Sequence, residues 1–495
     1  MLDKGSHAGP GEPPGGARWA IRIFILTLAI YLAVLPHRLD VLRPLPIDVP
    51  VPTGDEPYYL EIAHSLVYDR DLNLTNNHDI DRDYYRFYPT DLLPHRSQTA
   101  QPGHYSKHFP GLALLIAPWY WLGDRFWVGE VTASRAMVAA FMGVIGALLA
   151  ANVYLLSYEV TASIPVSLAV WAGLAFTNPF LSYSFLIFPA LPAALLVIYV
   201  YRQARCRGGG RWRSLLTGLA LAYLPWLHPR LALLVAPLAL YFLLAVRFRH
   251  DRLLPFLLPQ VASVGLLLAY DYWLYATPLP NFQDHAGLAL SVLPAAAVGS
   301  LVDQQWGLLI YAPVYAIVAV GLIRSYGYPD PALLGLKGAV RRLTPSRELI
   351  WLAILCLPYL LLVLSYRQWW GEWCPPGRYL VPVLPLAAVP LARALMVGPY
   401  TRTLYGMLLS ISLLIGALLV GNPRLMYNHP TGQAEMLLWL GERLGGLDLV
   451  STLPAIVAPN KDTIVYTIGW LAGFGAALAI SAWLDLRWRA QRRPS

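Results

Sequence analysis

Two adjacent carboxylates, Asp55 and Glu56, follow the first long apolar run of a chain in which charged residues are scarce. Carboxylates are costly near a bilayer, so a pair at this position asks for a functional reason. One reason is general-base chemistry, in which a carboxylate takes the proton of an attacking hydroxyl and speeds the reaction roughly 10²–10⁴-fold. The alternative is structural, because Asp55 stands where a helix would begin, with Pro57 in its first turn, and aspartate often caps a helix.

A departing phosphate would need cations beside such a base. Arginine binds phosphate oxygens with two parallel N–H groups, and lysine binds them as a point charge. The candidate donor-binding residues are Lys107, His108, His228, Arg230 and Arg378. The cations also have a simpler interpretation, in which the arginines are interfacial residues whose charge reaches water and Lys107 is an ordinary loop lysine.

The residues after Glu56 repeat at helical spacing. The apolar positions that share one face are Tyr59, Ile62, Ala63, Leu66 and Val67. The polar residues on the other side are Glu61, His64 and Ser65. This pattern predicts a short amphipathic helix that lies flat on the outer leaflet, with Asp55 and Glu56 at its N-terminus.

The composition identifies a polytopic membrane protein. The chain has 495 residues, of which 57% are hydrophobic and 13% charged, whereas soluble proteins carry about 25% charged residues. The net charge of +9 is attributed to basic residues in cytoplasmic loops, as is usual in membrane proteins. The sequence has no basic aromatic motif that would indicate nucleic-acid binding. Cys206, Cys356 and Cys374 offer neither a disulfide framework nor metal spacing.

The arginines predict the topology. Clusters at 202–213, 247–252, 324–347 and 487–493 are assigned to the cytoplasm, together with a disordered tail at 1–17. The apolar runs then predict an all-α fold of about 12 transmembrane helices, the first of them a retained signal anchor. The predicted spans are 19–36, 132–156, 162–178, 181–200, 214–227, 230–246, 254–274, 306–323, 349–366, 379–396, 401–420 and 464–484. Two shorter segments, 110–122 and 288–302, are expected to be interfacial or re-entrant.

This topology places most ionisable residues on the outer face, in loops 37–108, 366–378 and 422–463 and in the connection around His228. Ion-coupled transporters usually place such groups near the bilayer midplane instead. The distribution therefore favours a surface-facing active site over a conduction path. Trp369, Trp370 and Trp373 could stack on a sugar or prenyl chain, although such residues more often form the interfacial belt.

Several motifs resemble the GT-C superfamily of membrane glycosyltransferases. They are the outward Asp55-Glu56 pair, Tyr-Ser-Lys107-His-Phe-Pro110-Gly-Leu, Leu-Pro-Trp-Leu-His228-Pro-Arg230, Asp303-Gln-Gln-Trp-Gly307 and Pro375-Pro-Gly-Arg378-Tyr379. The most similar groups are glycosyltransferase family 39, which contains the protein O-mannosyltransferases, and the lipid A aminoarabinose transferases. The resemblance covers most of the chain and rests on the order and sidedness of the motifs.

The resemblance implies an inverting transfer of a hexose or pentose from a polyprenyl-phosphate donor to an unknown acceptor hydroxyl outside the cytoplasm. It implies that Asp55 is the base and that Glu56 supports it or binds substrate. Lys107 matches loosely the lysine of a Lys-Pro-Pro-Leu element near the donor phosphate, although His-Phe-Pro follows it here. It also implies a seven-helix module at 18–275, followed by a second transmembrane module at 276–495. The location would be the inner membrane of a bacterium, with the active site on the outer face.

Other classes of function remain open. A flippase for lipid-linked sugars, another transporter or a non-catalytic scaffold would also be polytopic, and would consume no donor. His104 and His108 have an i, i+4 spacing that can bind a metal, but no third ligand stands out. Enzymes of the resembled type generally need no cofactor, and a divalent metal stays open.

Overall fold

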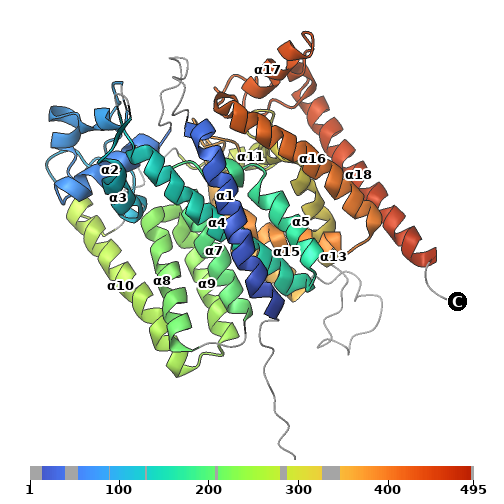
Figure 1. The fold of residues 1–495 in the computed structure, drawn as a ribbon, viewed down its shortest axis with the longest axis horizontal. Coiled ribbons are helices and arrows are strands. Elements are labelled where there is room, and N and C mark those ends of the chain that lie inside the picture. The colour runs from blue at the N-terminus through green and yellow to red at the C-terminus, as the bar shows by residue number, and fades with distance from the viewer. Residues whose placement is uncertain are drawn as a thin grey trace, which may run out of the picture.

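The chain is an all-α membrane protein, described here from a computed structural model that covers residues 14–39, 54–88, 90–128, 131–206, 210–278, 287–325 and 346–491. Helices make up nearly all of its regular structure (Figure 1). Of the tail predicted at 1–17, residues 1–13 lie outside the described residues, whereas residues 14–17 form the start of a helix and not a disordered tail. Most of the cluster at 324–347, Arg492 and Arg493 also lie outside the described residues.

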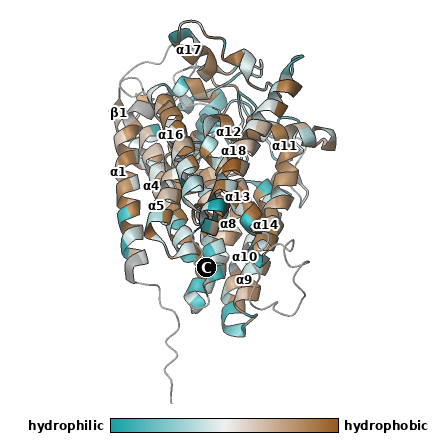
Figure 2. Ribbon diagram, turned by 90° about the vertical axis from the view of Figure 1, so that its right-hand side faces the viewer, coloured by the Kyte–Doolittle hydropathy of each residue, from teal (hydrophilic) through white to brown (hydrophobic). Residues whose placement is uncertain are grey.

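Six helices are long and apolar enough to cross a membrane, and they include both ends of the described chain. They are α1 (Pro14–Leu39), α4 (Ser134–Thr161), α10 (His250–Tyr275), α14 (Arg347–Leu364), α16 (Pro399–Gly421) and α18 (Thr463–Gln491). Apolar residues cover the middle of the bundle and polar residues gather at its ends (Figure 2).

Shorter helices complete the bundle. They are α5 (Ile164–Ala175), α6 (Phe180–Tyr183), α7 (Ala190–Arg205), α8 (Arg211–Leu227), α9 (Ala232–Ala245), α11 (Leu293–Val302), α12 (Leu308–Tyr311), α13 (Val318–Ser325), α15 (Ala388–Leu395) and α17 (Glu435–Arg443). Each predicted span contains at least one helix, but the number of crossings stays a prediction. Short strands β1 (Trp127–Val128) and β2 (Val131–Thr132) form one antiparallel pair.

Three predicted spans are broken by irregular backbone. The span predicted at 181–200 becomes α6 and then α7, which starts at Ala190, and the span at 306–323 becomes α12, a 3₁₀ turn and α13. The span at 379–396 begins with turns and becomes helical only at Leu384, first as a 3₁₀ turn and then as α15. These interruptions are tolerated because their residues are largely buried within protein, where other segments satisfy the backbone.

The broken helices pack closely. A β-carbon at Gly321 of α13 would lie 1.8 Å from the Pro390 carbonyl oxygen of α15, so only glycine permits this crossing. α15 also packs against α4 and α5. The predicted modules 18–275 and 276–495 therefore share a packed interior, and the boundary between them stays a prediction.

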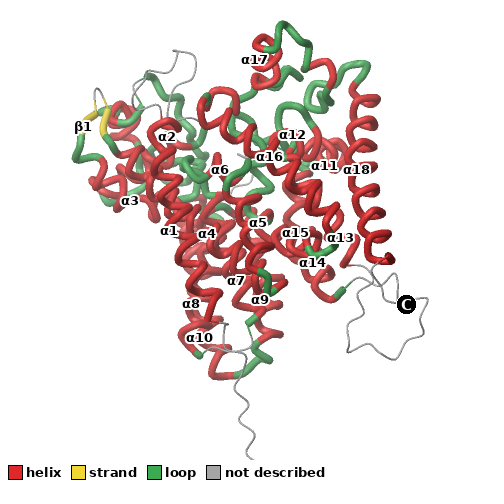
Figure 3. The backbone as a smooth tube through the Cα atoms, turned by 45° about the vertical axis from the view of Figure 1, so that its right-hand side comes forward, coloured by secondary structure: helices red, strands yellow, loops and turns green. Residues whose placement is uncertain are grey.

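One end of the bundle carries most of the loops and short helices. α2 (Glu56–Tyr68), α3 (Gly111–Gly123) and α17 lie at this end, and the turn between α9 and α10 lies at the other (Figures 1 and 3). The C-terminus of α10 joins the loop end, because the Ala100 amide donates to the Leu274 carbonyl over 2.9 Å. With 26 residues, α10 is about 39 Å long. The cluster at 247–252 therefore lies far from Asp55, as the predicted sidedness requires.

Candidate active site

Asp55 is held at the start of α2 by a tight turn. Gly54 has φ +58°, and a β-carbon there would lie 2.7 Å from the Trp373 carbonyl oxygen. Asp55 occupies the N-cap position, but its side chain accepts no capping hydrogen bond. The carboxylate pairs instead with the Arg378 guanidinium. The interpretation of Asp55 as a helix cap therefore does not describe this side chain.

Glu56 faces a different environment from Asp55. Its side chain is fully buried, with Oε2 3.0 Å from the Arg135 guanidinium of α4. Its Oε1 accepts the Ile187 amide over 3.1 Å. These two contacts tie the start of α2 to α4 and to the segment before α7. Glu56 is not among the residues that line the cavity beside Asp55.

That cavity has a volume of about 230 Å³. Six of the seven candidate residues line it, namely Asp55, Lys107, His108, His228, Arg230 and Arg378. They come from four separate stretches of sequence, so folding alone brings them together. Pockets for whole small ligands span roughly 300–1,000 Å³, so this cavity is somewhat smaller than such pockets.

Lys107 and His108 reach the cavity on a folded-back loop. The Lys107 amide donates to the His95 carbonyl over 2.9 Å, which closes an antiparallel turn. His95 Nδ1 lies 3.0 Å from His108 Nε2. The Tyr58 ring of α2 stacks on His95 with centroids 3.7 Å apart. Stacking and hydrogen bonding thus fix the loop against the helix that carries Asp55.

Arg230 follows directly on the end of α8. The helix ends at Leu227, and His228 Nδ1 accepts the Arg230 amide over 3.3 Å. The Arg230 side chain is buried, and its guanidinium lies 4.6 Å from the centroid of the Tyr379 ring. Its Nε has no hydrogen-bond partner, and no carboxylate pairs with it in the part of the chain that the structure describes.

Arg378, unlike Arg230, forms an ion pair with a carboxylate, that of Asp55. Besides Asp55, its guanidinium donates to the Gly371 carbonyl over 3.1 Å and lies 4.8 Å from the centroid of the Phe188 ring. Burial alone would raise the pKa of Asp55, but the charges of Arg378, His108 and His95, together with the hydrogen bond from Arg378, outweigh burial and lower that pKa to about 2. Burial lowers the pKa of His108 to about 3, so its imidazole is neutral near pH 7.

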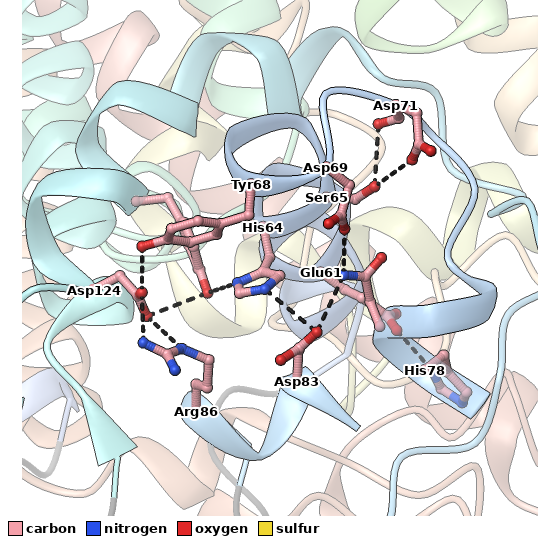
Figure 4. Close-up of polar contacts among 12 residues, drawn as sticks. Glu61, His64, Ser65, Tyr68, Asp69, Asp71, His78, Asp83, Arg86 and Asp124 are labelled. Carbon is pink, nitrogen blue, oxygen red and sulfur yellow. Dashed lines mark hydrogen bonds and ion pairs between the residues drawn. The ribbon is translucent and has the colours of Figure 1, made fainter. Parts of the chain in front are cut away.

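The polar face of α2 is not exposed as the sequence predicted. Glu61, His64 and Ser65 are all buried, because the following loop folds over them (Figure 4). His78 Nδ1 lies 2.8 Å from Glu61 Oε1, and Ser65 donates to the Asp71 carboxylate over 3.0 Å. The expectation of a helix with one solvated face is therefore wrong, since it ignored partners from residues 69–124.

The same network continues to the end of α3. His64 Nδ1 lies 2.9 Å from the Tyr120 hydroxyl and Nε2 lies 3.5 Å from Asp83. Arg86 makes a two-pronged contact with Asp124, with Nη2 2.8 Å from Oδ2. We call the residues labelled in Figure 4 the α2 network. They are Glu61, His64, Ser65, Tyr68, Asp69, Asp71, His78, Asp83, Arg86 and Asp124.

Sequence reasoning missed several residues around the cavity. Tyr59, Tyr366, Gln368 and Tyr379 line it. The sequence placed them in the helical repeat after Glu56, in the outer loop around 366–378 and in the Arg378 motif, but assigned none of them a role. None of the three tryptophans proposed for stacking lines the cavity. His95 carried no signal in the sequence, since its importance comes only from the contact with His108.

Two other sequence features have structural surroundings. The Asp303 carboxylate accepts the amides of Gln305 and Trp306, and also those of Ile456 and Val457, so this motif holds the loop before α18. His104 and His108 contact different residues, His78 and His95 respectively. Among the described residues, no three histidine, cysteine or acidic side chains are grouped to hold a metal.

Two solved structures are similar to the chain. ArnT from Cupriavidus metallidurans, bound to undecaprenyl phosphate, has 14% identity and a TM-score of 0.49 over 95% of this chain and 78% of its own. The archaeal oligosaccharyltransferase AglB from Archaeoglobus fulgidus, in complex with an inhibitory peptide and a dolichol phosphate, has 13% identity and a TM-score of 0.44 over 89% and 59%. No protein-family model and no curated protein matches the chain. At such scores neither likeness assigns a family or an activity, which must come from the site.

Proposed function

We propose that the protein is a membrane glycosyltransferase that moves a sugar from a polyprenyl-phosphate donor to an acceptor hydroxyl on the outer side of the membrane. The observation that supports this most is the cavity that joins Asp55 to Lys107, Arg230 and Arg378. A base and an anion site in one small space are what such a transfer requires.

Arg230 is the residue that most favours a phosphate as the anion bound in the cavity. A buried charge without a partner is costly, so proteins usually pair buried guanidinium groups. Arg230 is buried beside Lys107 in the cavity, and neither has a carboxylate partner among the described residues. A phosphate that enters the cavity would supply the missing anion, and arginine matches its oxygens in a two-pronged contact.

The reaction would then be a single displacement. Asp55 accepts the proton of the acceptor hydroxyl while the hydroxyl oxygen bonds to the anomeric carbon from the face opposite the phosphate. The bond from that carbon to the phosphate oxygen breaks, and polyprenyl phosphate leaves with the electron pair. Lys107, Arg230 and Arg378 stabilise the charge that grows on the phosphate. The anomeric configuration inverts. Glu56 holds α2 in place and touches no substrate.

The test is donor consumption by the purified protein in lipid vesicles. Undecaprenyl-phosphate hexoses and pentoses, each labelled in the sugar, are offered with a mixed acceptor extract from a bacterial envelope. We expect one sugar class to leave the lipid and to release undecaprenyl phosphate. Movement of intact labelled lipid between leaflets without consumption would instead identify a flippase. Arg367→Ala is the control variant and should consume the donor as the wild-type protein does, since Arg367 is exposed in the loop of Arg378 but does not line the cavity.

A further inference from the structure

We propose that Asp55 and the donor phosphate compete for Arg378, so that donor binding releases the carboxylate to act as the base. The inference rests on the proposed function and adds the order of events within that site. It identifies Arg378 as the group that couples donor binding to activation of Asp55.

The geometry of Arg378 carries this proposal. One terminal nitrogen of its guanidinium pairs with Asp55 Oδ2, and the other donates to the Gly371 carbonyl over 3.1 Å. This pair is partly accessible from the cavity, with exposed fractions of 12% for Arg378 and 16% for Asp55. A ligand in the cavity therefore has access to both partners.

The resting contact is unsuited to base catalysis. A carboxylate engaged by a guanidinium is a weak proton acceptor, and the pKa of Asp55 is lowered to about 2 despite its burial. Efficient general bases have pKa values nearer the working pH. No second ion-pair partner holds Asp55 in the described residues, so loss of Arg378 would leave its carboxylate free to accept a proton.

The charges of the reaction favour the exchange. Before transfer, Asp55 is an anion and the donor is a phosphodiester with one negative charge. After transfer, Asp55 is a neutral acid and the released phosphate monoester carries a charge of about −1.5 to −2. The negative charge therefore moves from Asp55 to the phosphate, and an arginine within reach of both follows it. The Tyr379 ring lies 4.6 Å from Arg230 and 5.8 Å from Arg378, so it offers a cation–π contact to both guanidinium groups at the site of the exchange.

The alternative is a fixed contact in which Arg378 stays on Asp55 and only Lys107 and Arg230 hold the phosphate. The two arrangements differ in one thermodynamic respect. If the anions compete, removing the charge of Asp55 strengthens phosphate binding through Arg378. If Arg378 is fixed, the substitution changes binding only through general repulsion between charges, which any nearby carboxylate would share.

The experiment measures binding of undecaprenyl phosphate, which contains the released group, to protein in lipid nanodiscs. The variants are Asp55→Asn, Arg378→Gln and the double variant. Glu372→Gln is the electrostatic control, because Glu372 lines the same cavity without an ion pair among the described residues. We expect Asp55→Asn to bind about tenfold more tightly, Glu372→Gln to change binding about twofold or less, and the gain to vanish when Arg378 is also replaced.

The outcomes separate this inference from the proposed function. An Asp55→Asn gain that survives in the Arg378→Gln background, or that Glu372→Gln matches, overturns the competition. Failure of the wild-type protein to bind the probe at all would overturn the proposed function itself. If Arg378→Gln does not fold, infrared difference spectra of the wild-type protein, with Asp55→Asn as the blank, provide the second measurement. An unchanged Asp55 carboxylate band on adding the probe contradicts the exchange.

Discussion

Two groups of charged residues lie at the same end of the molecule, on either side of α2. In the α2 network each carboxylate shown in Figure 4 has a partner, such as His78 for Glu61 and Arg86 for Asp124. In the cavity, Lys107 and Arg230 have no carboxylate among the described residues, and Asp55 shares its single ion pair with Arg378.

This difference in pairing distinguishes charged residues that stabilise the fold from charged residues that are available to bind a substrate. A satisfied buried network fixes one arrangement of its elements and leaves no interaction for a ligand. A cavity with more cations than carboxylates stabilises the fold less, because some of its charges are unpaired, and those charges can bind an anion. The α2 network therefore serves to hold the helix, and the cavity beside Asp55 is where chemistry is expected.

The largest expected effect comes from Asp55. Asp55→Asn keeps the shape of the side chain but removes the proton acceptor, so we expect transfer to fall by roughly 10²–10⁴ or more. The melting temperature should fall only modestly, because the asparagine oxygen can still accept a hydrogen bond from Arg378. The measurement is release of labelled sugar from the donor class identified in vesicles. Asp124→Asn, in the α2 network, is the matched carboxylate control and should lower stability more than turnover. Near-normal transfer by Asp55→Asn would exclude its role as base.

The helices were largely predictable from the sequence. Long apolar runs bounded by arginines mark α1, α4, α10, α16 and α18, because crossing a bilayer imposes a length and a composition. The broken spans were not predictable in detail. Hydropathy gives the same signal for a continuous helix and for the 3₁₀ turn that joins α12 to α13.

The site was predictable only as a set of residue types on one face. Motif order indicated Asp55, Lys107, Arg230 and Arg378, and folding brings them into one cavity. Their pairings depend on long-range contacts that local patterns do not encode. The pairing of Asp55 with Arg378 joins residues 323 positions apart, and it decides whether Asp55 caps a helix or faces the cavity.

The next effect concerns Arg230 and tests the excess of cations directly. Arg230→Ala should weaken binding of undecaprenyl phosphate by about 30-fold, since a charge-assisted contact contributes roughly 2 kcal/mol. Stability without the ligand should stay the same or rise, because a buried charge without a carboxylate is removed. Binding in nanodiscs and thermal unfolding measure the two quantities. A large loss of stability without a change in binding would mean that Arg230 is structural.

Arg86 is the matched arginine of the α2 network, where the opposite result is expected. Arg86→Ala leaves the buried Asp124 carboxylate without its cation, so unfolding should become easier by about 2 kcal/mol. Arg82→Ala is the control, because both partners of the Arg82–Asp91 pair are exposed and such pairs contribute about 0.5 kcal/mol or less. Chemical unfolding in detergent measures both. Equal losses would show that the network does not depend on its buried contacts.

The last prediction is a pH dependence of stability in which both regions take part. Burial lowers the pKa of His104, beside the α2 network, to about 4 and that of His95, beside the cavity, also to about 4. Their pKa in the unfolded chain is about 6.5. As the pH falls from 6.5 towards 4, the unfolded chain therefore binds protons that the folded chain does not, and stability is lost.

The melting temperature should accordingly fall between pH 7 and pH 4.5, and His104→Gln should make that fall smaller. The part due to His104, which is buried, is on the order of 2 kcal/mol. Glu61 acts in the opposite direction, because burial raises its pKa and the folded chain then holds that proton more tightly. A melting temperature of His104→Gln that follows the wild-type curve throughout this range would show that His104 is charged in the folded protein. The α2 network would then rest on one more ion pair, from His104 to Asp79, whose nearest atoms lie 3.9 Å apart.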